Sequence, residues 1–135
     1  MSLFRFMLDT NIVSDVVRYP YGKASRIIEA RGLERVCTSV LVAAELRYGA
    51  EKSASPRLAE TVDRVLRGLV VLPFEPPSDR EYARIRHALV STGRPIGPVD
   101  LFIAAHAISL DLTLVTANVS EFSRVPGLKV ENWLD

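Results

Sequence analysis

The sequence lacks the features that secreted and membrane-bound proteins depend on. Its 135 residues include one cysteine, Cys37, which excludes an internal disulfide and favours a reducing compartment. Its apolar runs, such as 40–44 and 69–74, are far too short to cross a bilayer. Asp9 interrupts the first apolar run after a few residues, so no secretory signal is expected. These absences predict a cytoplasmic protein without membrane association.

A strong charge of either sign is also missing. The chain has 17 basic and 16 acidic residues, a net charge of +1, so no protein-wide positive field attracts nucleic acid. Only three of the basic residues are lysines. The excess of arginine fits either phosphate recognition or a compositional bias of the genome, and the count alone does not choose. A hydrophobic fraction of 48% excludes bulk disorder, and the length predicts one domain, 1–135.

Several common site motifs are absent. The sequence contains no GxxxxGK[ST] phosphate loop, no GxGxxG and no GxSxG elbow. It has no Cys/His cluster with zinc spacing, because His87 and His106 fall on different predicted helices. Nucleotide-loop, dinucleotide, serine-hydrolase and structural-zinc chemistry are therefore disfavoured.

Short apolar segments alternate with amphipathic ones along the chain. The predicted strands are 4–8, 35–38, 69–72, 112–116 and 129–133. The predicted helices begin near Asn11, at Lys23, after Ser39, after Ser55, near Ser78 and at Pro98. The continuous apolar run at 69–72 predicts a strand buried on both faces. The alternation predicts an α/β fold, a parallel sheet covered by helices, whose site lies beyond the carboxyl ends of the strands.

Three carboxylates stand alone in apolar surroundings. Asp9 follows the first strand directly and is either a site residue or an N-cap worth ~1 kcal/mol. Asp100 lies in the first turn of an apolar helix, where a helix-dipole contact of about 0.3–1 kcal/mol is the other explanation. Glu45 shares a predicted core-facing stripe with Leu41 and Tyr48. A buried ion pair, or a rotated helix that exposes Glu45, would explain it equally well.

Carboxylates that converge on one crevice repel one another, and each raises the pKa of the others. A divalent cation such as Mg²⁺ or Mn²⁺ relieves this repulsion and suits oxygen ligands. A phosphodiester is the natural substrate for such a centre. Thr116, Asn118 and Glu121, at the end of a later strand, reach the same edge, unless Asn118 only stabilises a turn and Glu121 is solvated.

The whole chain resembles the PIN-domain ribonucleases of the VapC toxin type. The resemblance rests on the order and spacing of MLDTN at 7–11, AELRYG at 44–49, IGPVDLFIAAHA at 96–107, LVTAN at 114–118, FSRVPGL at 122–128 and ENW at 131–133. It implies a three-layer α/β/α fold with a mainly parallel sheet of four to five strands. It also implies Mg²⁺- or Mn²⁺-dependent cleavage of RNA, a homodimer, and a cognate VapB-type antitoxin as partner.

The resemblance also implies roles for individual residues. Asp9, Glu45 and Asp100 match the acidic metal-site positions. The small polar positions that support the site correspond to Thr10, Asn11 and Thr116. For a further position after the last long strand, Asn118 and Glu121 are both candidates.

Arginines near the predicted crevice are candidates for RNA contact. Arg80 and Arg84 share one helix face with His87, and Arg94 lies in the loop before Asp100. A solvated face balanced by Asp79 and Glu81 is the alternative.

Two other functional classes compete with an RNA-cleaving enzyme. A phosphoacceptor signalling domain would need paired acids after the first strand, where only Asp9 stands. A catalytically silent PIN-like module that only binds a partner remains the alternative, and metal-dependent RNA cleavage would separate it from the enzyme.

Overall fold

A computed structural model describes residues 3–135, so the first two residues of the predicted domain 1–135 lie outside the described part. Strands and helices alternate along the chain, as the sequence predicts. The strands are β1 (Phe6–Leu8), β2 (Val36–Ser39), β3 (Val70–Leu72), β4 (Thr113–Val115) and β5 (Val130–Glu131). The helices are α1 (Thr10–Arg18), α2 (Lys23–Arg31), η1 (Leu33–Arg35, a 3₁₀ turn), α3 (Val40–Ser53), α4 (Pro56–Arg67), α5 (Ser78–Ser91), α6 (Pro98–Ser109) and α7 (Val119–Phe122).

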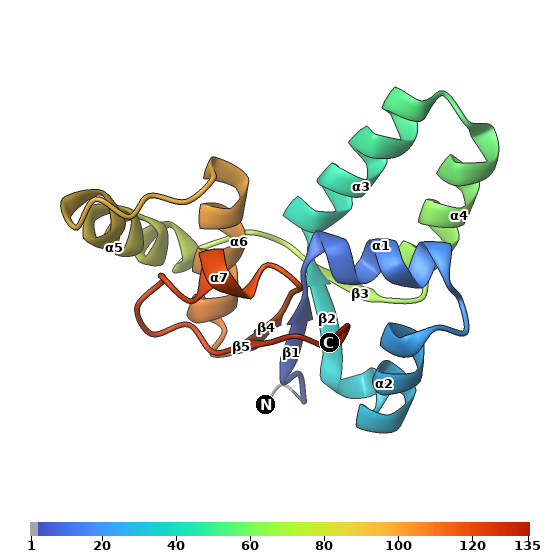
Figure 1. Ribbon diagram of the computed structural model, residues 1–135, viewed down its shortest axis with the longest axis horizontal. Helices are drawn as coiled ribbons and strands as arrows, with labels where there is room; N and C mark the ends of the chain where they lie inside the picture. The colour runs from blue at the N-terminus through green and yellow to red at the C-terminus, as the bar shows by residue number, and fades with distance from the viewer. Residues whose placement is uncertain (1–2) are drawn as a thin grey trace.

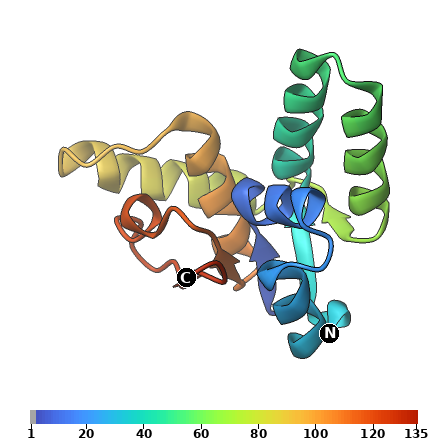
Figure 2. The ribbon, with the colours of Figure 1, turned by 45° about the vertical axis from the view of Figure 1, so that its right-hand side comes forward.

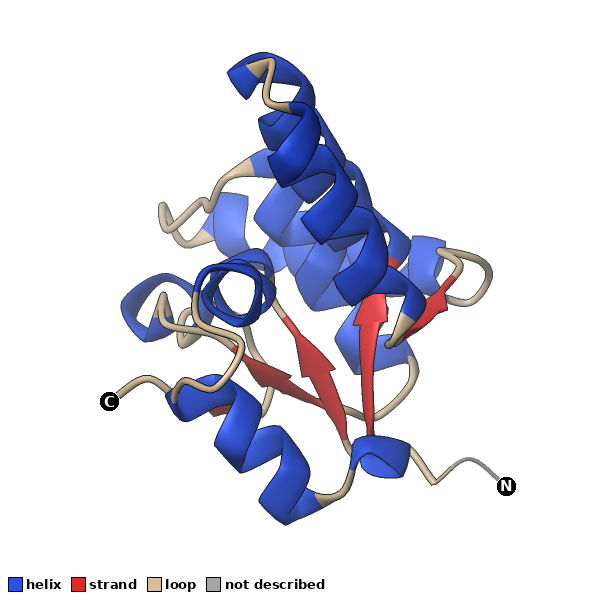
Figure 3. Cartoon of the chain, turned by 90° about the vertical axis from the view of Figure 1, so that its right-hand side faces the viewer, coloured by secondary structure: helices blue, strands red, loops and turns tan. Residues whose placement is uncertain are grey.

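The strands form one parallel sheet in the order β3-β2-β1-β4-β5. Helices pack on both sides of it (Figure 3), which confirms the predicted α/β/α class. In register, Leu8 pairs with Thr38 on one side and with Val115 on the other. The carboxyl ends of the three central strands therefore meet at one edge, as a parallel sheet requires.

The central strand carries the most deeply buried side chains. Met7 and Leu8 of β1 are fully buried. The Thr38 hydroxyl donates a 2.7 Å hydrogen bond to the Leu8 carbonyl and fixes β2 against β1 at its carboxyl end. Asp9 follows at once, so the core anchors the chain immediately before the first candidate site residue.

The prediction that 69–72 is buried on both faces is wrong. β3 lies at the edge of the sheet, and Val70 is 47% exposed. The strand pairs on one side only, with β2. An apolar run of this length does not distinguish a central strand from an edge strand, because both bury at least one face.

The predicted face of α3 is also wrong. The side chains that α3 buries are Val42, Ala43, Leu46 and Ala50, whereas Tyr48 is 64% exposed. Leu41 and Glu45 are half-buried at the margin of that face. At the start of this helix, the Ser39 hydroxyl accepts from the Leu41 amide at 3.0 Å and caps the helix as predicted.

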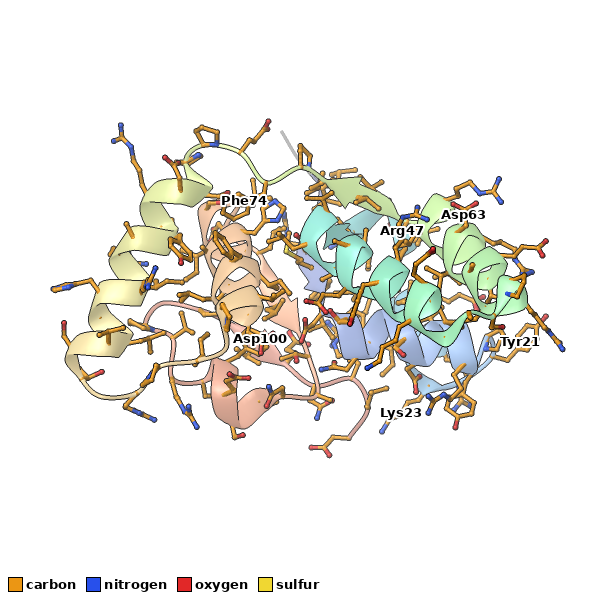
Figure 4. The ribbon with its side chains drawn as sticks, turned by 90° about the horizontal axis from the view of Figure 1, so that it is seen from above. Tyr21, Lys23, Arg47, Asp63, Phe74 and Asp100 are labelled. Carbon is orange, nitrogen blue, oxygen red and sulfur yellow. The ribbon has the colours of Figure 1, made fainter. Side chains whose placement is uncertain are left out.

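Helices α3 and α4 form a hairpin that projects away from the sheet (Figures 1 and 2). Ser55 caps α4 by accepting from the Leu58 amide at 3.2 Å. Arg47 of α3 pairs with Asp63 of α4 at 3.4 Å (Figure 4). Across residues 3–135, no helix combines the length and apolarity needed to cross a membrane.

Candidate active site

Asp9 is a buried carboxylate at the carboxyl end of the central strand. It is 4% exposed and occupies the N-cap position of α1, but its side chain makes no capping hydrogen bond. Its Oδ2 instead accepts from the Thr116 hydroxyl at 2.7 Å. Burial raises the pKa of Asp9, although the Thr116 hydroxyl and the Thr10 amide oppose the rise. The N-cap explanation therefore does not account for the direction of this side chain.

Thr116 and Asn11 hold Asp9 in place from two different strand ends. Asn11 Nδ2 donates to Asp9 Oδ2 and to the Thr116 hydroxyl, at 3.3 Å each, while its Oδ1 accepts from the Ala117 amide at 2.9 Å. Thr116 is fully buried, directly after β4. Within the described chain, the Thr10 side chain makes no hydrogen bond, so only its backbone acts on Asp9. The polar residues that follow β1 and β4 thus lock these two strand ends together.

Asp100 and Glu121 form a carboxyl pair beside Asp9. Asp100 lies in the first turn of α6, half-buried, between the α5–α6 and α1–α3 parts of the molecule (Figure 4). It shares a hydrogen bond with Glu121 of α7. Burial, the Glu121 hydrogen bond and the negative charges of Asp9, Glu121 and Glu45 raise the pKa of Asp100 to about 7. The proton that this pair binds therefore lies mainly on Asp100, whose pKa is raised, rather than on Glu121, whose pKa is lowered.

Glu121 is fixed by three neighbours. Its Oε1 accepts from the Gly97 amide at 2.9 Å, and its Oε2 accepts from Asn118 Nδ2. The hydrogen bond from Asp100, followed by the Gly97 and Asn118 amides, lowers the pKa of Glu121. Of the two residues between which the sequence left the choice open, Glu121 therefore brings its carboxylate to Asp100, and Asn118 holds it there.

Glu45 approaches the site from α3. Its side chain is half-buried, and its charge contributes to the raised pKa of Asp100. In the described part of the chain it has no ion pair, so the predicted alternative of a buried ion pair does not apply. The rotation of α3 places Glu45 beside the crevice rather than in the core.

Negative charge at this edge has little compensation. Within residues 3–135, no Lys or Arg lies within ion-pair distance of Asp9, Glu45, Asp100 or Glu121. The one cation that acts on the site is Arg124, which lowers the pKa of Glu121 and donates to the Pro95 carbonyl at 3.2 Å. Arg124 was not predicted as a site residue, although it lies three residues after Glu121 and one helical turn brings the two together.

The donor set suits a hard divalent cation in its chemistry. All four side chains offer carboxylate oxygens, and their mutual repulsion is what such a cation would relieve. Over the described residues, however, no three Asp, Glu, His or Cys side chains stand close enough together to hold a metal ion. Asp9 and Glu45 each act electrostatically on Asp100, so direct coordination by all three would require their side chains to move closer together.

The arginines predicted to contact RNA lie on α5 and in the loop that follows it. Arg84 pairs with Glu81 at 2.7 Å, which favours the solvated face for this residue. Arg80 and Arg94 are exposed, and among the described residues their side chains have no ion-pair partner.

His106 is fully buried, and its ring packs against Phe74 at 5.5 Å.

Comparison with known proteins identifies the family. Residues 6–128 match the model of the PIN domain. The chain is 40% identical over 134 residues to Ribonuclease VapC2 of Haemophilus influenzae, covering 98% of this chain and 100% of the relative. It is 38% identical over 134 residues to the tRNA(fMet)-specific endonuclease VapC of Salmonella typhimurium, covering 97% and 99%.

Solved structures agree with the sequence relatives. The crystal structure of DNA-bound VapBC from Salmonella typhimurium superposes with a TM-score of 0.91 at 36% identity, over 96% of this chain and 98% of that one. VapBC2 from Rickettsia felis, bound to a DNA fragment from its promoter, gives a TM-score of 0.90 at 34% identity, over 96% and 99%. The order of the motifs and the sheet agree with these comparisons: this chain belongs to the PIN-domain family, among its VapC-type members.

Proposed function

We propose that this protein is a metal-dependent endoribonuclease that acts as the toxin of a toxin–antitoxin pair. The observation that carries the proposal is the cluster of Asp9, Asp100, Glu121 and Glu45 at the carboxyl edge of the sheet, with the pKa of Asp100 raised to about 7. Such a cluster is costly to fold without a cation, and this cost suggests a site kept for function. The names of the relatives, which include ribonucleases and endonucleases, support an RNA substrate.

Asp9 and Asp100 would hold Mg²⁺ or Mn²⁺, with Glu45 as a further ligand or as the group that orients a water molecule. A divalent cation bound there would polarise a phosphodiester and make a water molecule more acidic. Hydrogen bonds from Thr116 and Asn11 favour the ionised form of Asp9, against the burial that raises its pKa, and hold its carboxylate in place. Glu121, held by the Gly97 amide, has a lowered pKa and accepts a hydrogen bond from Asp100. When Asp100 ionises to bind the cation, its proton would therefore pass to water rather than to Glu121.

Cleavage of RNA by the purified protein tests this function. We expect cleavage in Mg²⁺ or Mn²⁺, none in EDTA, and recovery when the metal is added back. Asp9→Asn and Asp100→Asn should each reduce cleavage at least about 10²-fold, the scale expected when a group that stabilises the transition state is removed. The matched control is Asp79→Asn, an exposed acid on α5.

The result that contradicts the proposal is full activity of both site variants in the presence of metal. Absence of cleavage by the wild-type protein on every RNA would instead favour the silent partner-binding module. The first RNA to test is tRNA(fMet), because the relative from Salmonella typhimurium is named for it.

A VapB-type antitoxin is the proposed partner. Solved VapBC complexes match this chain, and the acidic crevice is complementary to a basic side chain on the segment that would cover it. We expect the cognate antitoxin to stop cleavage at a 1:1 ratio, and an antitoxin lacking that segment to leave cleavage unchanged. A homodimer is the proposed assembly, and light scattering of the purified protein measures it directly.

A further inference from the structure

A buried hydrogen bond connects the two helices that carry Asp100 and Glu45. His106, on α6, is 1% exposed, and its Nδ1 lies 2.8 Å from the hydroxyl of Ser39, which is fully buried. Ser39 is the N-cap of α3, and the same hydroxyl accepts from the Leu41 amide. One oxygen therefore joins the end of β2, the start of α3 and the last turn of α6.

This hydrogen bond fixes the imidazole ring. Burial lowers the pKa of His106, so the ring is neutral near pH 7 and offers one donor and one acceptor nitrogen. The ring also packs edge-on against Phe74, at 5.5 Å between centroids. The Pro73 backbone also acts on the ring and opposes the lowering of the His106 pKa. Within the described part of the chain, the Ser39 hydroxyl is the side-chain group that hydrogen-bonds the ring.

The hydrogen bond joins α6 and α3 at points that lie several residues away from the carboxylates these helices carry. Asp100 precedes His106 by six residues on α6, and Glu45 follows Ser39 by six residues on α3. At the rise of an α-helix, each carboxylate is roughly 9 Å along its helix from the joined residues. α3 leaves the sheet at the carboxyl end of β2, whereas α6 runs alongside the sheet toward the start of β4 (Figure 1). A change of about 10° between them would therefore move Asp100 relative to Glu45 by roughly 1.5 Å.

We propose that His106 and Ser39 are positioning residues, which set the separation of Asp100 and Glu45 through the hydrogen bond between the last turn of α6 and the start of α3. The inference rests on the proposed function, because it concerns the spacing of the same carboxylates. A buried polar contact that orients site residues at a distance commonly changes metal affinity or activity by about 10- to 100-fold when it is removed. Neither residue touches the crevice directly, so their loss should alter geometry rather than RNA contact.

The experiment compares four variants of the full chain with the wild type. His106→Gln removes the nitrogen at the Nδ1 position, whereas His106→Asn keeps a polar atom there. Ser39→Ala removes the hydroxyl while the ring stays. Ser55→Ala is the matched control, because it removes a serine cap from α4, a helix without candidate site residues. For each variant, kcat and KM for RNA are measured at a temperature well below its Tm. The Mn²⁺ affinity is measured by calorimetry, and the Tm is measured separately.

We expect His106→Gln and Ser39→Ala to lower kcat about 10- to 100-fold and to weaken Mn²⁺ binding about 10-fold, with KM for RNA unchanged. His106→Asn should keep most of the wild-type kcat and most of the Mn²⁺ affinity. Ser55→Ala should lower the Tm while kcat and Mn²⁺ affinity stay at wild-type values. If His106→Gln does not fold, Ser39→Ala and its control carry the same comparison.

The inference is overturned if His106→Gln and Ser39→Ala behave like Ser55→Ala, with a lower Tm and wild-type kcat and Mn²⁺ affinity. It is also overturned if His106→Asn is as impaired as His106→Gln. Failure of the proposed function looks different, since the wild-type protein itself would then show no metal-dependent cleavage.

Discussion

Replacing Thr116 by valine tests the hydrogen bonds that hold the buried carboxylate of Asp9. The Thr116 hydroxyl donates to Asp9 at 2.7 Å and accepts from the Asn118 amide at 3.0 Å. Valine has nearly the same shape, so no cavity forms. A hydrogen bond to a charged group contributes about 1.5–3 kcal/mol, and we expect the free energy of unfolding to fall by about 2–3 kcal/mol when Asp9 is ionised. For 135 residues this lowers the Tm by about 7–10 °C.

The stability that Thr116→Val loses should be larger at high pH than at low pH. The pKa of Asp9 is already raised by burial, and the Thr116 hydrogen bond opposes that rise. Without it, the pKa of Asp9 in the folded protein moves further above the unfolded value. Asp9 then retains its proton at mildly acidic pH and needs the hydroxyl less, so the deficit is small there. The deficit grows as pH rises through the folded pKa.

Urea unfolding of metal-free protein at pH 5 and pH 8 measures both effects. Thr116→Ser is the control, because it keeps the hydroxyl and loses only a methyl group, which costs about 1 kcal/mol at either pH. A Thr116→Val variant within about 0.5 kcal/mol of the wild type at pH 8, or one with equal losses at both pH values, would refute the reasoning.

Three further predictions concern the neighbours of Asp9. Because the folded pKa of Asp100 is raised to about 7, its contribution to stability is full below pH 4 and is lost as pH rises through 7. Between pH 5.5 and pH 8.5, the Tm of metal-free Asp100→Asn should therefore fall less than the Tm of the metal-free wild type. Scanning calorimetry measures both. Asn118→Ala releases one oxygen of Glu121 and should slow single-turnover cleavage several-fold without weakening RNA binding. If Arg80 and Arg94 contact phosphates, replacing both with glutamine should reduce the salt slope of RNA binding, measured in an inactive background, by about 1.4. An unchanged slope would exclude both from the interface.

The sequence predicted the order of the elements and the edge of the sheet where the carboxylates meet. Asp9 was recognisable because an apolar strand directly precedes it, and strand ends have fixed positions in a parallel sheet. The burial of β3 was predicted wrongly, since the neighbours that leave Val70 at an edge come from the sheet order and not from the strand itself. The residues of β3 alone did not show whether the strand lies at the edge or in the centre of the sheet.

Side-chain direction was the harder part of the site. The face that α3 buries is turned toward the helices that pack against it, α4, α1 and α6, and the pattern of Leu41 and Tyr48 does not show it. The choice between Asn118 and Glu121 depended on the short turn of α7, which bends the longer side chain back to Gly97. Neither the buried face of α3 nor the choice of Glu121 over Asn118 can be read from the spacing of residue types alone.

The hydrogen bond between Asp9 and Thr116 spans 107 positions of the chain, and this separation affects when activity can begin during synthesis. A ribosome makes roughly 5–20 residues per second from the N-terminus, so the first carboxylate waits unsupported for several seconds. Until β4 and α7 emerge, the nascent polypeptide has neither the hydroxyl that steadies Asp9 nor the glutamate that shares a proton with Asp100. Thr116 and Glu121 both lie in the last fifth of the chain, so the carboxyl cluster is complete only after that part has been synthesised.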